Sequence, residues 1–249
     1  LRGEKFYPLT PAIKAKLSLK LDYLSSQEEE LVDYLACFRA PASVSLLARL
    51  LGLPMEEVVE ITEEFGQKQL LMEEEQGEEL VVRFSQELLR IYAYERLSLA
   101  KKRMLHHQIA QGMEDQLGDS LYHAQLLNEI AYHYKLSKQP IKSLEYELHY
   151  LEATLKFHHE LFPIYSREFG FIEKTDDSNQ SAVLDQFDRI RREIEGLERK
   201  HQNHKDFQLL VLRFLYLEGR YAIRTGDYQQ GMDNIQQVII SVSYTHLTL

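Results

Sequence analysis

The spacing of the apolar residues constrains this chain more than any other feature, because they recur every three or four positions along most of its 249 residues. The clearest run is Val183, Phe187, Ile190, Ile194 and Leu197. Residues at this spacing share one face of a helix, so a second helix can pack against them. We therefore expect a mainly α-helical protein.

Residues 10–85 begin with two helix-start signals. Thr10 stands before Pro11, and Ser25 stands three residues before Glu28 as a capping box. Both arrangements suit the first turn of a helix, where side chains accept hydrogen bonds from backbone N–H groups and a proline costs nothing. The sequence therefore predicts that one helix begins at each of these points.

The rest of this region combines short helices with a β-like pair. The expected elements are a helix at 44–51 closed by Gly52, a helix at 54–66, and β-like runs at 70–72 and 80–84 joined by a Glu-rich turn. Helices followed by a hairpin predict a winged helix-turn-helix-like domain over residues 10–85.

Every long segment beyond residue 85 has a helical pattern. We expect connecting helices over 86–118 with a break near Ser98, a hairpin of helices at 124–136 and 141–157, a loop at 174–180, and a final hairpin at 207–224 and 228–240. Residues 119–240 are therefore predicted to form a second, helical domain.

The two ends of the chain differ from the rest. Residues 1–9 have the pattern of a linker and begin with Leu1 in place of Met, so we expect a piece of a longer protein. Residues 241–249 depart from the helical pattern and resemble translated sequencing-adapter ends. We interpret them as a non-native tail.

Composition excludes several classes of protein. No apolar window is long enough to cross a membrane, and the N-terminal residues lack a signal-peptide pattern, so we expect neither membrane insertion nor export. The single cysteine, Cys37, lies in an apolar helical pattern and is interpreted as a buried structural thiol. Both features predict a cytoplasmic protein.

No motif for catalysis or for a cofactor is present. The chain contains no phosphate-binding loop, no dinucleotide-binding glycine motif and no nucleophile elbow. The closest approaches to a metal site are the pairs His106-His107, His158-His159 and His201 with His204, which we interpret as solvated or core side chains. We predict no catalytic residue, no metal and no cofactor in these residues.

Charge argues against DNA binding by the winged-helix-like domain. The helix expected to read the major groove and the Glu-rich turn carry ten glutamates against Lys68: Glu56, Glu57, Glu60, Glu63, Glu64, Glu73, Glu74, Glu75, Glu78 and Glu79. A penalty of about 1 kcal/mol for each misplaced charge outweighs a few base contacts. With a formal net charge of −10, we expect no direct nucleic-acid contact.

Basic residues gather after the predicted hairpin, at Arg83, Arg90, Arg96, Lys101, Lys102 and Arg103. They would suit a nucleic acid or an acidic partner. The alternative is a basic helix face that lies beside the protein's own acidic residues or faces water, and this second interpretation is the one we favour.

The same region carries a resemblance to a known family. The motifs are Val82-Arg83-Phe84-Ser85-Gln86-x-Leu88-Leu89-Arg90, Tyr94-Glu95-Arg96-Leu97-Ser98, and Arg103-x-Leu105-His106-x-x-Ile109-Ala110. They resemble the STAND-type ATPase regulators, which include the large LuxR-type and maltose-activator-like transcription factors, although Gln86 stands where that family has His. The resemblance covers roughly residues 10–160 and, less densely, 207–240.

The resemblance implies an ATP-dependent signal-transduction or transcription regulator whose nucleotide site precedes these residues. In that family the winged helix commonly packs against the ATPase core instead of DNA. The family also implies TPR-like hairpins, which Ile130-Ala131-Tyr132-His133-Tyr134 and Gly226-Asp227-Tyr228 resemble. The second match is degenerate, because Gly231 stands where Ala is usual and Ala222 where Tyr is usual.

TPR-like hairpins stack so that the first helix of each pair lines a concave groove. Ala131 and Gly219 match the position of that helix at which a TPR has a small residue. This match sets the register of each helix and predicts which residues are exposed. The predicted groove consists of Gln125, Asn128, Tyr132, Lys135, Arg213, Tyr216 and Arg220. We expect it to bind a protein partner, a neighbouring domain of the same chain or a small inducer, and ordinary exposed residues without a ligand are the alternative.

Three classes of function follow. The first is a non-catalytic interaction module of an ATP-dependent regulator. The second is a DNA-binding winged-helix transcription factor, and the third is a TPR scaffold subunit without regulatory output. Salt-sensitive binding to duplex DNA would distinguish the second from the others.

Overall fold

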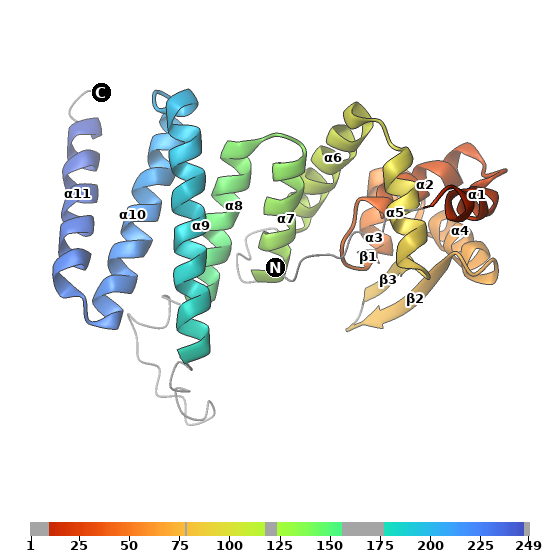
Figure 1. The fold of residues 1–249 in the computed structure, drawn as a ribbon, viewed down its shortest axis with the longest axis horizontal. Helices are drawn as coiled ribbons and strands as arrows, with labels where there is room; N and C mark the ends of the chain where they lie inside the picture. Colours follow the sequence, from red (N-terminus) through yellow and green to blue (C-terminus); the bar gives the residue numbers. More distant parts are fainter. Residues whose placement is uncertain (1–9, 78, 118–123, 156–176, 247–249) are drawn as a thin grey trace. The chain divides into compact units, whose positions relative to one another are not determined.

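The structure, a computed structural model, describes residues 10–77, 79–117, 124–155 and 177–246, and in these residues the protein is mainly helical (Figure 1). The chain divides into two compact units. We call residues 1–116 with 136–138 the N-terminal unit, and residues 117–135 with 139–249 the C-terminal unit. Among the described helices, none combines the length and apolar character that a membrane span requires.

Short helices surround a small sheet in the N-terminal unit. Its elements are α1 (Pro11–Leu21), α2 (Ser26–Ala36), β1 (Ala42–Ser43), α3 (Val44–Leu51), α4 (Met55–Gln67), β2 (Leu71–Gln76), β3 (Glu79–Phe84), α5 (Glu87–Arg96) and α6 (Leu99–Leu117). The predicted helix break near Ser98 is confirmed, because α5 ends and α6 begins on either side of it.

The helix ends predicted from the sequence are present. The Ser25 side chain accepts from the Glu28 backbone N–H at 3.3 Å, and the Glu28 carboxylate accepts from the Ser25 N–H at 2.7 Å. Helix α3 ends at Gly52 in the left-handed conformation, with φ 66°. Only glycine adopts this conformation without steric cost, so the local sequence fixes the length of this helix.

The sheet is antiparallel with strand order β1-β3-β2. Leu71 pairs with Phe84, and Glu75 pairs with Leu80. The expected runs at 70–72 and 80–84 were too short, because most of the Glu-rich segment belongs to strand β2. Pairing with β3 overrides the poor strand propensity of consecutive glutamates, whose side chains remain in solvent.

The core of the N-terminal unit collects the apolar faces of these elements. Its most deeply buried side chains include Leu31, Leu47, Val58, Phe65, Val82 and Leu89, contributed by α2, α3, α4, β3 and α5. Full burial of one such side chain stabilises a fold by about 1.5–3 kcal/mol. The helices therefore stabilise the small sheet by burying its apolar side chains.

The C-terminal unit consists of helices in the residues that the structure describes. They are α7 (Ala124–Leu136), α8 (Pro140–Leu155), α9 (Asp177–His201), α10 (Lys205–Thr225) and α11 (Tyr228–His246). The predicted stripe of α9 is confirmed as a packing face, because Phe187, Ile190 and Ile194 are buried in one cluster with side chains of α8 and α10. Residues 156 and 157 of the predicted hairpin lie outside the described residues.

Two sequence-based boundaries in this unit are wrong. The loop expected at 174–180 is helical from Asp177, because Asp, Ser and Asn favour the start of a helix as much as a loop. The segment from Ser241, expected to leave the helical pattern, continues α11 as far as His246. No glycine or proline interrupts this stretch, and extending an existing helix costs little.

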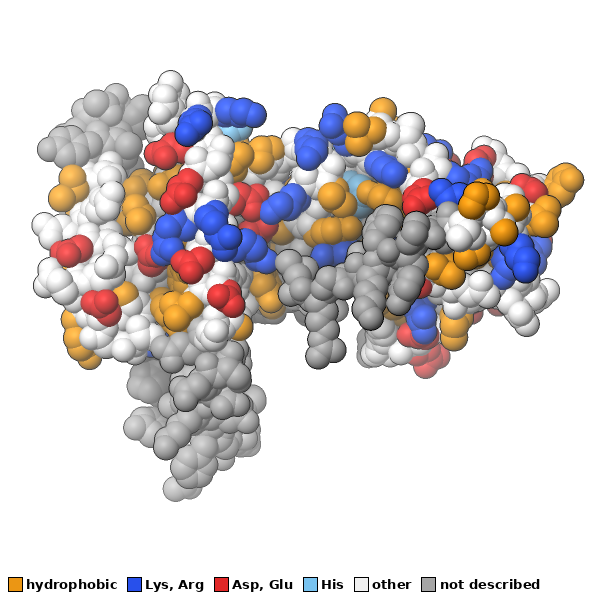
Figure 2. All heavy atoms as spheres, in the orientation of Figure 1, with side chains coloured by type: hydrophobic (Ala, Val, Ile, Leu, Met, Phe, Trp, Pro, Cys, Tyr) orange, Lys and Arg blue, Asp and Glu red, His pale blue; other side chains and the backbone are white. Residues whose placement is uncertain are grey.

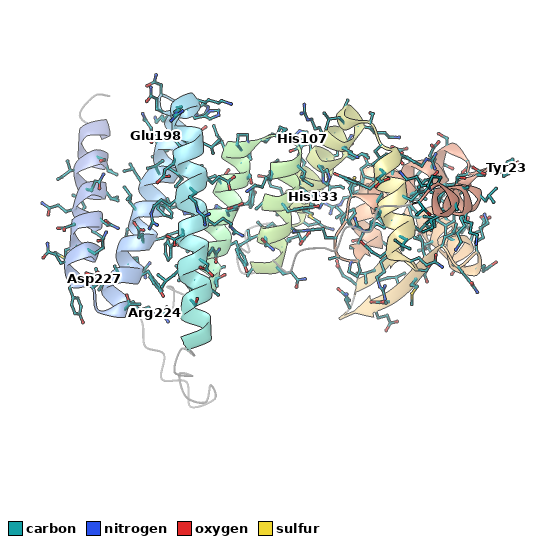
Figure 3. The ribbon with its side chains drawn as sticks, viewed as in Figure 1. Tyr23, His107, His133, Glu198, Arg224 and Asp227 are labelled. Atoms are coloured by element: carbon teal, nitrogen blue, oxygen red, sulfur yellow. The ribbon has the colours of Figure 1, made fainter. Side chains whose placement is uncertain are left out.

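Helices α10 and α11 approach each other closely. A methyl group added at Gly231 would lie 2.7 Å from the carbonyl oxygen of Gly219 and 2.5 Å from Cγ1 of Ile223. Glycine at this position therefore permits the contact. At the end of α10 (Figure 3), Arg224 donates to the carbonyl oxygen of Leu155 at 2.7 Å, which ties α10 to α8.

Candidate functional site

The N-terminal unit exposes an acidic surface on α4 and on the β2–β3 hairpin. We use the name acidic surface for its exposed carboxylates, which are Glu56, Glu60, Glu63, Glu64, Glu73, Glu75 and Glu79. Met55 and Met72 are exposed on the same two elements. The surface thus combines negative charge with polarisable apolar side chains, which can adapt to a partner.

Few of these carboxylates have an internal counter-charge. Glu64 pairs with Lys68 at 2.6 Å, and Glu74 on the same hairpin pairs with Arg83 at 2.6 Å. In the described parts of the chain, no ion pair within 4.0 Å reaches the other six members of the acidic surface. The surface therefore keeps a strongly negative potential.

The basic residues after the hairpin are mostly engaged within the N-terminal unit. Arg90 pairs with Glu87 at 2.5 Å and donates to the carbonyl oxygen of Ala36 at 3.2 Å. The remaining contacts are Arg83 with Glu74, Arg96 with Glu29, Lys101 with Asp33, and Lys102 over the ring of Tyr94. These contacts agree with the intramolecular interpretation of the basic residues. Arg103 is exposed and has no such contact in the described part of the chain.

Two groups with reactive chemistry are buried in the same unit. Burial raises the pKa of Cys37 to about 12, so its thiol is not a nucleophile near neutral pH. Burial lowers the pKa of His106 to about 4, and a hydrogen bond of 3.1 Å joins its Nε2 to the Tyr94 hydroxyl. Both groups fit a structural role, as predicted for Cys37.

The other predicted histidine pairs have different outcomes. His158 and His159 lie outside the described residues, and the rings of His201 and His204 lie 6.5 Å apart. Within the described ranges, no group of three or more His, Cys, Asp or Glu side chains could hold a metal ion.

The first half of the predicted groove lies on α7. Gln125 is exposed, whereas Asn128 and Tyr132 are half-buried. Lys135 is exposed but forms ion pairs with Glu147 of α8 at 3.3 Å and with Glu193 of α9 at 2.6 Å. Lys135 therefore joins three helices.

The second half of the predicted groove lies on α10. Arg213 contacts both ring nitrogens of His149 at 3.1 Å and pairs with Glu152, so it joins α10 to α8. Tyr216 is exposed, and the guanidinium of Arg220 lies 5.6 Å from the centre of its ring. The structure thus brings Tyr216 and Arg220 together, while Lys135 and Arg213 take part in contacts between helices.

Glu147 is the charged residue of this unit that the sequence interpretation missed. Burial raises its pKa above the usual range, and the nearby Glu193 raises the pKa further, while Lys135 and Arg189 oppose the shift. Its neighbours in sequence gave a signal, because Leu144, Leu148 and Leu151 place it on the apolar side of α8. A carboxylate at such a position requires a cation, and Lys135 supplies one.

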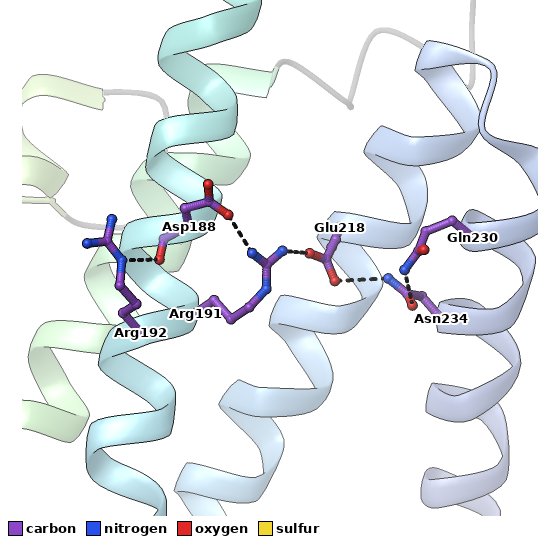
Figure 4. Close-up of polar contacts among 6 residues, drawn as sticks. All are labelled: Asp188, Arg191, Arg192, Glu218, Gln230 and Asn234. Carbon is purple, nitrogen blue, oxygen red and sulfur yellow. Dashed lines mark hydrogen bonds and ion pairs between the residues drawn. The ribbon is translucent and has the colours of Figure 1, made fainter.

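A second polar chain crosses α9, α10 and α11 (Figure 4). Arg191 bonds to Asp188 and Glu218, Glu218 accepts from Asn234 at 3.0 Å, and Asn234 accepts from Gln230 at 3.5 Å. Asn234 is buried, so these bonds satisfy a polar group inside the helix pack. Over the outer face of α9, Figure 2 shows basic and acidic side chains interspersed.

Comparison with known proteins supplies no family for this chain. A scan against protein-family models gives no match, and a search of curated proteins gives no significant relative.

Proposed function

We propose that this chain is a non-catalytic, protein-binding part of an ATP-dependent regulator of the STAND type, with a winged-helix-like N-terminal unit and a TPR-like C-terminal unit. The observation that carries the proposal is the acidic surface. Six of its carboxylates have no counter-charge among the described residues, so the surface suits a partner with positive charge.

The order of elements supports the winged-helix part of the proposal. Helix α2, strand β1, helices α3 and α4, and the β2–β3 hairpin follow one another, and the sheet order β1-β3-β2 places β1 beside β3. In such a domain α4 is the helix that would enter the major groove. Its exposed Glu56, Glu60 and Glu63 would face phosphates there, which favours a protein partner over DNA.

The C-terminal unit supports the TPR-like part. Helices α7 and α8 form one hairpin, and α10 and α11 form another. The close approach of Gly219 to Gly231 gives the second hairpin the tight packing that small residues permit. The 25-residue helix α9 lies between these hairpins in sequence, so the repeats are not regular.

A titration with charged peptides tests the acidic surface. The probe is a fluorescent amphipathic helical peptide with Lys on its polar face, and the same peptide with Glu in place of Lys serves as its counterpart. We expect the Lys peptide to bind and the Glu peptide not to bind. Changing Glu56, Glu60 and Glu63 together to Gln should weaken binding by about tenfold or more, because three complementary charges are lost.

A matched variant controls for net charge. Asp185, Glu195 and Glu198 of α9 are exposed, and Asp185→Asn with Glu195→Gln and Glu198→Gln removes three charges elsewhere. This variant should bind the Lys peptide as the unchanged protein does. Equal weakening by both triple variants would contradict a protein-binding role for the acidic surface.

We propose that the part of the TPR-like face that contains Tyr132, Tyr216 and Arg220 binds a protein partner or inducer of the regulator. Substituting all three by Ala should abolish partner capture or the response to the inducer. An intact response would remove this role. A phosphate-binding loop encoded upstream of Leu1 in the gene would support the ATPase class, and its absence from the complete reading frame would contradict it.

A further inference from the structure

An open pocket in the N-terminal unit lies between α2, α3 and α6. Its volume is about 370 Å³, within the range of small-molecule sites. The lining residues are Tyr34, Arg49, Leu50, Gln108, Gln111, Gly112 and Asp115. The proposed protein-binding surfaces do not include any of these residues.

Helix α6 forms one wall of the pocket. Gln108 lies three positions before Gln111 and four before Gly112, and Asp115 lies four positions after Gln111 and three after Gly112, so they share one face of the helix. A Cβ atom at Gly112 would lie 3.0 Å from Cδ1 of Leu46 in α3, so glycine lets the two helices approach. The Tyr34 hydroxyl donates to Oε1 of Gln108 at 3.1 Å, which leaves the amide nitrogen of Gln108 as a donor.

The two charged residues of the pocket have opposite signs and stand on different helices. Arg49 belongs to α3 and Asp115 to α6, and both are exposed. The structure records no hydrogen bond or ion pair for either side chain within the described residues. Several charges deeper in this unit are paired, as with Arg90 and Glu87 or Lys101 and Asp33. The pocket therefore offers one anion-binding and one cation-binding group that do not neutralise each other.

We propose that this pocket binds a free α-amino acid. The guanidinium of Arg49 receives its carboxylate, for which the planar fork of donors is suited, and the carboxylate of Asp115 receives its ammonium group. The amides of Gln108 and Gln111 supply further hydrogen bonds, and Leu50 contacts the ligand's side chain. A simple anion or cation would meet a like charge, and an apolar ligand would leave these polar groups without partners.

Thermal unfolding of the whole chain with each proteinogenic L-amino acid gives the first test. A concentration of about 10 mM stabilises the folded state measurably even when Kd is millimolar. We expect at least one amino acid to raise Tm, and calorimetric titration then gives its Kd. The N-acetyl and carboxamide derivatives of that amino acid each lack one charge, and each should bind about tenfold more weakly or worse.

Two variants test the assignment of the charges. Arg49→Gln and Asp115→Asn each remove one charge from an exposed side chain, and each should weaken amino-acid binding about tenfold. Arg49→Gln should discriminate less against the carboxamide, and Asp115→Asn less against the N-acetyl derivative. Lys16→Gln and Asp22→Asn, at exposed sites outside the pocket, should leave Kd unchanged.

An amide NMR titration of the unchanged protein provides a measurement that does not depend on variants. The amino acid should shift the amide signals of Gln111 and Gly112. The proposal is overturned if no amino acid binds, if the singly charged derivatives bind as tightly as the parent, or if the shifts lie away from the pocket. A protein-binding acidic surface would remain possible in each case, because the two sites share no residue.

Discussion

The contact between α10 and α11 gives the sharpest prediction about stability, because one methyl group at Gly231 should disturb it. The added carbon would lie 2.7 Å from the carbonyl oxygen of Gly219, and 2.5 Å from Cγ1 and 3.0 Å from the backbone nitrogen of Ile223. Two of these three atoms belong to the backbone of α10, so they cannot move aside by a side-chain rotation. The two helices must separate to accept the group.

Two opposing terms set the size of the effect. Replacing glycine by alanine inside a helix stabilises by about 1 kcal/mol, whereas forcing a methyl group into a packed contact costs about 1–3 kcal/mol. Because the contacts at Gly231 are so short, we expect the upper part of that cost. The Gly231→Ala variant should therefore lose about 1–2 kcal/mol of unfolding free energy.

Gly196 provides a matched control in the same unit. It lies inside α9, and a methyl group added there would meet no atom within 4 Å. Gly196→Ala should therefore gain about 0.5–1 kcal/mol, from helix propensity alone. The two substitutions make the same chemical change, but their effects on stability should have opposite signs.

Urea unfolding followed by circular dichroism measures both variants, and hydrogen exchange of the α10 and α11 amides locates the change. Protection of these amides should fall in Gly231→Ala and be kept in Gly196→Ala. A Gly231→Ala protein as stable as the unchanged one would refute the close packing of these helices.

Three further predictions concern the N-terminal unit. The folded state holds the pKa of His106 at about 4, against 6.5 for an unperturbed histidine, so the unfolded state binds the proton first as the pH falls. The stability that neutral His106 contributes to the folded state is complete above pH 6.5, and about 3 kcal/mol of it is lost as the pH falls to 4. The unfolding free energy of His106→Gln should therefore fall less over this pH range, as measured by denaturant titrations at several pH values. Ser25→Ala should lower the unfolding free energy by about 1 kcal/mol, measured by urea titration, because the α2 capping box loses its hydroxyl. Cys37, which is 1% exposed, should react with a thiol reagent only as fast as the protein opens, and rapid labelling of the folded protein would contradict its burial.

Local signals in the sequence predicted local structure well. The capping residues of α2, the left-handed Gly52 and the apolar stripe of α9 depend on neighbours within a few positions, and all three are confirmed. The extent of β2 and the start of α9 were missed. The first depends on pairing with β3, and the second on residue types that serve both loops and helix starts.

For the candidate groove, the sequence predicted exposed residues but not the contacts between helices. Its register predicted exposed residues, and Gln125 and Tyr216 are exposed. The ion pairs of Lys135 with Glu193 and of Arg213 with Glu152 join residues 58 and 61 positions apart, and no local pattern encodes such contacts. Only the packing of the helices brings these side chains together.

The proposal that the α4 surface binds protein and not DNA can be tested by measuring the binding of duplex DNA. Fluorescence anisotropy with a labelled duplex at low and at physiological salt compares the unchanged chain with a variant in which Glu56, Glu60 and Glu63 are Lys. We predict that the unchanged chain shows no salt-dependent binding and that the Lys variant acquires it, because the counter-ions of the phosphates can then be released. The proposal would be contradicted if the unchanged chain bound the duplex tightly and in a salt-dependent manner, and if these substitutions altered that binding.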